Sequence, residues 1–158
     1  MLDFIERFSE IISVIIQSIT TIVIFFLAFG KDRYMQSRTV LQSRLENLYC
    51  PFYQKFLVGS FHKNNTLSTA SIEVRTTFLD LLSKNIQYMN AKSQTLYFAF
   101  YIEFLNLLEA YDNNPDFPFA ENAKAFDYAF ISLSKSLLSE YAHICRQLKL
   151  PKPLCLLW

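Results

Sequence analysis

The chain has 158 residues, 52% of them hydrophobic and 16 of them phenylalanines, so it can bury a sizeable core. Its formal net charge is only +1, and its two glycines are too few for a strand-and-turn protein or for a glycine-rich phosphate loop. These values favour an all-α protein with one domain and one accessory segment.

Residues 11–30, IISVIIQSITTIVIFFLAFG, contain no charged side chain. A helix of this length reaches roughly 30 Å, the thickness of the hydrocarbon layer of a membrane, so we expect a transmembrane helix. A cleaved signal peptide is one alternative, with Ala-Phe-Gly at 28–30 as the cleavage site. The run is too long for it, and residues 1–10 are acidic rather than basic. A buried helix of a soluble protein is the other alternative.

Basic residues flank this segment unequally. Arg7 precedes it, whereas the basic residues that follow are Lys31, Arg33, Arg38 and Arg44. Because the more basic flank of a transmembrane helix stays in the cytoplasm, we expect residues 1–10 outside the cytoplasm and residues 31–158 inside it.

Four polar residues interrupt the apolar segment, and they share one helix face: Ser13, Gln17, Thr20 and Thr21. Ser and Thr hydroxyls can return to their own backbone, but a Gln amide in lipid needs a partner. The polar face therefore predicts self-association of this helix, at a helix seam or around a narrow pore. The alternative is a plain anchor that tolerates these side chains.

The remainder of the chain reads as a bundle of about four helices. From Tyr34 to Phe56 the apolar residues follow one helix face, and Pro51 should kink this helix near Leu48. Residues 58–69 and 112–119 are rich in turn-forming residues and predict loops. The further helices are expected at about 70–90, 92–111 and 120–149, the second of these being apolar almost all round and therefore the most buried.

Residue types for catalysis or metal binding do not form a known pattern. The three cysteines lack C-x-x-C spacing, the two histidines are far apart, and no nucleophile or P-loop motif is present. We therefore expect no enzyme, no metal and no cofactor. An enzyme acting on lipid stays an alternative, because such a site can lack short motifs.

Charge is unevenly distributed along the predicted bundle. Residues 31–63 contain six basic residues against two acidic ones, and residues 103–127 contain six acidic residues against Lys124. Membrane topology accounts for the first basic residues, but Arg44, Lys55, His62 and Lys63 lie further along and alternate with aromatic residues. Such a pattern can hold phosphate and stack a base, so these four are the predicted ligand-binding residues. Aromatic residues at helical spacing can equally be core.

The stretch RLENLYCPFYQKF, with Arg44, Leu48, Tyr49, Pro51, Phe52 and Tyr53 just after one N-terminal span, resembles small bacterial membrane proteins of antiviral defence. It is most similar to a membrane effector associated with type III CRISPR systems. That resemblance implies a protein of the bacterial inner membrane whose cytosolic domain senses cyclic tetra-adenylate. It also implies a homo-oligomer, a tetramer or larger, and no double-stranded nucleic acid as partner. The ligand would then control a membrane-perturbing segment.

A second hypothesis from the same sequence is a membrane tether with no gating function. In it the helical domain docks a protein partner through its acidic or its C-terminal apolar surface.

Overall fold

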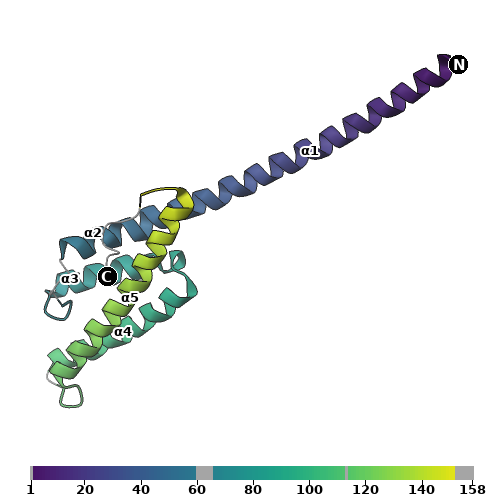
Figure 1. Ribbon diagram of the computed structural model, residues 1–158. Coiled ribbons are helices and arrows are strands. Elements are labelled where there is room, and N and C mark those ends of the chain that lie inside the picture. Colours follow the sequence, from purple (N-terminus) through teal and green to yellow (C-terminus); the bar gives the residue numbers. More distant parts are fainter. Residues whose placement is uncertain (1, 60–65, 113, 152–158) are drawn as a thin grey trace. The chain divides into compact units, whose positions relative to one another are not determined.

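The computed structural model describes residues 2–59, 66–112 and 114–151, and the fold is all-α, with no strand in these ranges (Figure 1). The chain divides into two compact units, Met1–Val40 and Leu41–Trp158. We call the second unit the helical domain. The predicted all-α class is confirmed, with one long apolar N-terminal helix and a helical bundle.

Helix α1 spans Leu2–Arg44 and continues past residue 30 without a break. The helical stretch Ile15–Val58 contains one segment that is long and apolar enough to cross a membrane. This segment lies near the N-terminus, and none of it is buried. The core helix of a soluble protein would be mostly buried, so this alternative loses support. A signal sequence near the N-terminus can also be this long and this apolar, so the structure leaves the signal-peptide alternative open. The ends of the transmembrane helix at residues 11 and 30, and the start of the cytosolic domain at residue 31, stay predictions.

A π-helical turn, η1 (Leu45–Tyr49), separates α1 from α2 (Cys50–Val58). In it the amide of Cys50 donates to the carbonyl of Leu45, one residue further back than in an α-helix. Pro51 follows directly and has no amide hydrogen to give to the carbonyl of Asn47, so the regular ladder cannot pass this point. The sequence predicts a kink near Leu48, and the structure has a π-helical turn at this place.

The predicted helix at 70–90 is in fact two elements, α3 (Ile72–Lys84) and a 3-10 turn, η2 (Ile86–Tyr88). The break falls at Asn85, which leaves the helical conformation at φ −122° and ψ 19°. Its side-chain amide donates to the carbonyl of Leu81 at 2.9 Å, a local bond that competes with helix continuation. The single long helix of the prediction was therefore wrong at its C-terminal end.

Helices α4 (Ala91–Tyr111) and α5 (Phe119–Leu148) agree closely with the predicted ranges, and they lie side by side in opposite directions (Figure 1). Asn90 caps α4 by accepting from the amide of Ser93 at 2.8 Å. Helix α5 ends with Lys149 in the left-handed conformation, at φ 59°. The amide of Leu150 there reaches the carbonyl of Cys145 at 2.8 Å, which closes the last turn.

The core of the helical domain is built largely from phenylalanine. The ring of Phe130 on α5 lies 5.2 Å from Phe78 of α3 and 5.7 Å from Phe100 of α4, between ring centres. The Phe100 ring also stacks on Phe126 at 5.1 Å. Such aromatic pairs add about 0.5–1.5 kcal/mol each beyond the burial of their area. One face of α5 thus holds α3 and α4 together.

Helix α4 is not the most buried helix, and this part of the prediction was wrong. Its core face is buried through Phe100, Phe104 and Leu107, but the opposite face exposes large apolar side chains, with Phe98 66% exposed. The reason is that α4 packs mainly on α5. The apolar residues around α4 therefore belong to two surfaces, one that packs in the core and one that is exposed.

Candidate functional site

The two described members of the predicted ligand-binding set, Arg44 and Lys55, lie in different surroundings. Arg44 belongs to a polar cluster around Glu140, and Lys55 lines a pocket between α2 and α3. His62 and Lys63 lie outside the described residues. The shared phosphate site of these four residues stays a prediction, and the two described members occupy different surroundings.

The Glu140 cluster joins the end of α1, η1, η2, the start of α4, and α5. We define it as Arg44, Tyr49, Tyr88, Asn90, Ser93, Ser136 and Glu140. The guanidinium of Arg44 donates to the Glu140 carboxylate at 3.2 Å and to the Tyr88 carbonyl at 2.7 Å. The Tyr49 hydroxyl donates to the same carboxylate at 2.5 Å. Elements far apart in sequence are therefore tied at one carboxylate.

Glu140 is well compensated despite its burial, since only 10% of its side chain is exposed. The second carboxylate oxygen accepts from the Ser93 hydroxyl, and the amide of Asn90 adds a bond at 3.1 Å. A buried carboxylate with a paired cation and several donors avoids most of the desolvation cost of an isolated charge. The arrangement is that of a structural junction.

Tyr49 is held in its neutral form by this cluster. Burial raises the pKa of its hydroxyl well above the ordinary value, and the hydrogen bond to Glu140 and its negative charge raise it further. The nearby Arg44 lowers it in part. Tyr49 therefore remains a donor to Glu140 at neutral pH, and the hydroxyl does not act as a base.

These contacts weigh against Arg44 as a phosphate ligand. Its guanidinium already donates to the Tyr88 carbonyl, the Tyr49 hydroxyl and the Glu140 carboxylate. Binding an external phosphate would require breaking bonds that are charge-assisted and partly shielded from water. Sequence analysis missed Glu140, although a signal was present. Glu140 lies three residues after Leu137 and four before Ile144, on the apolar face of α5, where a charge needs a buried partner.

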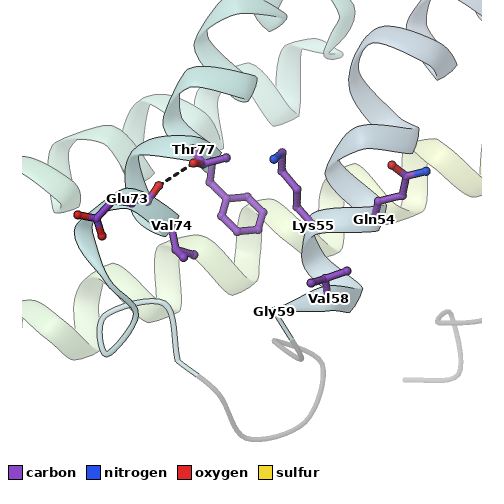
Figure 2. A pocket seen from close by; sticks show the side chains of 8 residues that line it. Gln54, Lys55, Val58, Gly59, Glu73, Val74 and Thr77 are labelled. Carbon is purple, nitrogen blue, oxygen red and sulfur yellow. Dashed lines mark hydrogen bonds between the residues drawn. The ribbon is translucent and has the colours of Figure 1, made fainter.

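The pocket beside Lys55 has a volume of about 450 Å³. Figure 2 shows α2 forming one wall, with Gln54, Lys55 and Val58, and α3 the other, with Glu73, Val74 and Thr77. Gly59 and Phe78 complete the lining. The volume is within the range of small-ligand sites, but the pocket is an open depression and not an enclosed cavity.

Lys55 supplies the positive charge of this pocket. The carboxylate of Glu73, on the α3 wall, points away from Lys55 (Figure 2). A hydrogen bond from Ser71 lowers the pKa of Glu73, and its own backbone amide and Arg75 lower it further. Glu73 is therefore ionised at neutral pH but does not face the group that Lys55 would bind, so the described lining can pair with one phosphate through Lys55.

The two described cysteines, Cys50 and Cys145, are free thiols. Burial raises the pKa of Cys145, as does the neighbouring Cys50, so its thiol stays protonated and weakly nucleophilic at neutral pH. The Cys50 sulfur lies 3.7 Å from the hydroxyl of Tyr141. Within the described ranges no three His, Cys, Asp or Glu side chains are grouped as metal ligands.

The polar face of the N-terminal helix divides into two kinds of residue. The hydroxyl of Thr20 donates to the carbonyl of Ile16 at 2.8 Å, and that of Thr21 donates to the carbonyl of Gln17 at 2.9 Å. Both hydroxyls are thus satisfied within their own helix. The Gln17 amide has no partner among the described residues, and Ser13 is exposed. Of the predicted association residues, Gln17 carries the strongest need for an external partner.

A second buried arginine, Arg75 on α3, was not predicted as special. It is only 5% exposed, and its guanidinium carbon lies 4.7 Å above the ring centre of Tyr111. Its Nε and Nη1 atoms have no hydrogen-bond partner within the part of the chain that the structure describes. A cation–π contact replaces the carboxylate that Arg44 has.

Comparisons with protein-family models, with curated proteins and with solved structures found no match to this chain. The resemblance to CRISPR-associated membrane effectors thus rests on the residues that suggested it.

Proposed function

We propose that this chain is a single-pass protein of the bacterial inner membrane that works by binding, as an antiviral defence effector. In this proposal the N-terminus faces outward and residues 31–158 lie in the cytoplasm, in agreement with the basic residues that follow the apolar run. The helical domain senses a nucleotide messenger, with cyclic tetra-adenylate as candidate, and controls an oligomer of the N-terminal helices.

The main support is the continuity of α1. One uninterrupted helix carries both the candidate membrane window and Arg44, whose guanidinium belongs to the Glu140 cluster. A helix transmits rotation or displacement along its axis better than a flexible linker does. A ligand that repacks the cluster would therefore act on the membrane segment through α1.

The ligand-binding step is best supported at the pocket between α2 and α3. Lys55 can donate to one phosphate, and the apolar wall around Val58, Val74 and Phe78 can lie against a base. A messenger with several phosphates needs further cations besides Lys55, and His62 and Lys63 stay the predicted contributors. Arg44 is no longer the preferred candidate for the phosphate-binding residue.

Thermal unfolding of the full chain in detergent, with a panel of cyclic nucleotides, tests this function. A ligand at a hundred times its dissociation constant adds about 2.7 kcal/mol to the stability of the folded state. We expect stabilisation by a cyclic oligoadenylate and its loss in Lys55→Gln. Lys84→Gln, an exposed lysine on α3 outside the pocket, is the matched control. Stabilisation unaffected by Lys55→Gln, or none with any nucleotide, would reject the sensor.

Orientation is tested separately, by a reporter fused after Trp158. Cytoplasmic activity of the reporter is expected from the four basic residues after the apolar run against one before it. Periplasmic activity would remove every argument for a cytosolic messenger.

The tether is the second candidate, and the exposed apolar face of α4 favours it. The surface of a soluble protein domain seldom has several large apolar side chains side by side unless a partner covers them. A tether needs no ligand in the pocket, so it predicts no nucleotide effect in the unfolding experiment.

A further inference from the structure

The outward face of α4 carries four large apolar residues in one stripe: Phe98, Tyr101, Ile102 and Leu105. Their spacing of three, one and three residues places them on one side of the helix. Each is at least 40% exposed, and Phe98 is 66% exposed. We call these four residues the α4 stripe.

The stripe is not a by-product of packing against the core. The opposite face of α4 already buries Tyr97, Phe100, Phe104 and Leu107 in the helical domain. A helix that is hydrophobic on both faces is normally covered on both. The stripe is therefore a candidate for a surface that another molecule covers.

Charges at the C-terminal end of α4 indicate how a second copy of the helix would be oriented. Glu109 and Asp112 are exposed there, and the helical repeat places both on the side of the stripe. A second α4 packed parallel would place these like charges opposite each other. Packed antiparallel, it brings each acidic end near the N-terminal end of the other helix, whose dipole favours negative charge.

We propose that the α4 stripe is a dimer interface with the α4 stripe of a second copy of this chain, in an antiparallel two-fold arrangement. The axis passes between Tyr101 and Ile102, so Phe98 of one copy faces Leu105 of the other. A two-fold interface uses the same patch on both subunits, and this stripe is self-complementary in that sense.

This proposal specifies how the copies contact each other in the oligomer of the proposed function, and it rests on that oligomer alone. Anchoring in one membrane raises the effective concentration of the copies toward one another, so a modest apolar stripe suffices for pairing. Nucleotide binding is not required. A dimer without nucleotide stabilisation would reject the sensor and retain the interface, and the reverse result would reject the interface only.

Cysteine cross-linking of the full chain in native membranes tests the interface. The background carries Cys50→Ser, Cys145→Ala and Cys155→Ser, and its thermal unfolding is checked first. Ile102→Cys lies at the proposed axis, and we expect most of the chain to form a dimer with a short bismaleimide. Ser139→Cys, on the exposed side of α5, is the control and should give no dimer.

Thr95→Cys reports the helix direction. In an antiparallel pair the two residues 95 are about 20 Å apart along the axis, beyond a short cross-linker, whereas in a parallel pair they lie together. Cross-linking at 102 but not at 95 supports the proposal. Cross-linking at both positions, at neither, or equally at position 139 overturns it. A different protein, or the C-terminal tail, covering the stripe would also prevent the dimer from forming.

A second variant keeps the test decisive if the cysteine background unfolds. Ile102→Glu with Leu105→Glu, in the otherwise native chain, places four like charges in the dimer interface. Both residues are exposed, so the helical domain should keep its unfolding temperature. We expect amine-reactive cross-linking of the dimer to fall at least tenfold, while Ser139→Glu leaves it unchanged. A folded double variant that still dimerises overturns the interface.

Discussion

Arg44 and Arg75 are two largely buried arginines with opposite surroundings. Arg44 pairs with Glu140 and donates to a carbonyl and a hydroxyl, whereas Arg75 lies over the Tyr111 ring with two unpartnered nitrogens. A buried arginine paired with a carboxylate can hold two elements together, but an aromatic ring compensates the buried charge only in part. Arg44 therefore connects parts of the fold, whereas the burial of Arg75 lowers the stability of the folded state.

Removing the partner of Arg44 should have the largest effect. Glu140→Ala leaves the guanidinium buried without its carboxylate, and we expect a loss of about 3 kcal/mol in the free energy of unfolding. Denaturant unfolding of the full chain in detergent measures it. Asp80→Ala breaks the exposed Lys84–Asp80 pair and is the control, with no measurable change expected. Equal effects of the two variants would show that Glu140 is not a junction.

Replacing both charges sharpens the same comparison. Arg44→Gln with Glu140→Gln keeps hydrogen-bonding groups of similar size and leaves no buried ion. We expect the double variant to lose about 1–2 kcal/mol less than the sum of the two single variants. Strict additivity in this double-mutant cycle would mean that the two side chains do not act on each other.

Tyr49→Phe should have an intermediate effect with a characteristic pH dependence. At neutral pH the lost hydrogen bond to Glu140 should cost about 1–2 kcal/mol. Because the pKa of Tyr49 is raised in the folded state, the unfolded chain releases this proton first as the pH rises above about 10. The native protein should thus lose stability above that pH more steeply than Tyr49→Phe. Parallel pH curves would place Tyr49 outside the cluster.

Arg75→Met should have the smallest effect, and in the opposite direction. Methionine keeps contact with the Tyr111 ring and removes the unpartnered buried nitrogens, so we expect unchanged stability or a gain of about 1 kcal/mol. Thermal unfolding measures it, with Arg75→Lys as control, which keeps the charge without the planar stacking group. A loss comparable to that of Glu140→Ala would abolish the contrast between the two arginines.

Sequence periodicity predicted the helices well because it depends on near neighbours. The apolar repeats along 92–111 and 120–149 gave α4 and α5 to within a residue or two. The local rule failed at Asn85, where a side-chain bond ended α3, and on α4, where apolar character gave no information about which face meets the core. Helix existence is a local property, but burial depends on the final packing.

The candidate sites were harder to predict, because their contacts link distant residues. Arg44 was identified as a notable basic residue, but its partner Glu140 lies 96 positions away and no periodicity joins the two. The pocket around Lys55 needs α3 as its second wall, which the composition of α2 does not indicate. The polar face around Gln17 could be predicted from the sequence, since a helix by itself places those residues on one side.

The distance of 96 positions between Arg44 and Glu140 also sets an order of assembly during synthesis. At roughly 5–20 residues per second, Arg44 is made about 5–20 s before its carboxylate exists. Throughout that interval the end of α1, η1 and the start of α4 lack the residue that ties them together. The apolar segment at 11–30 therefore meets its environment while the rest of the chain is still incomplete, and the junction cannot close before Glu140 has been made.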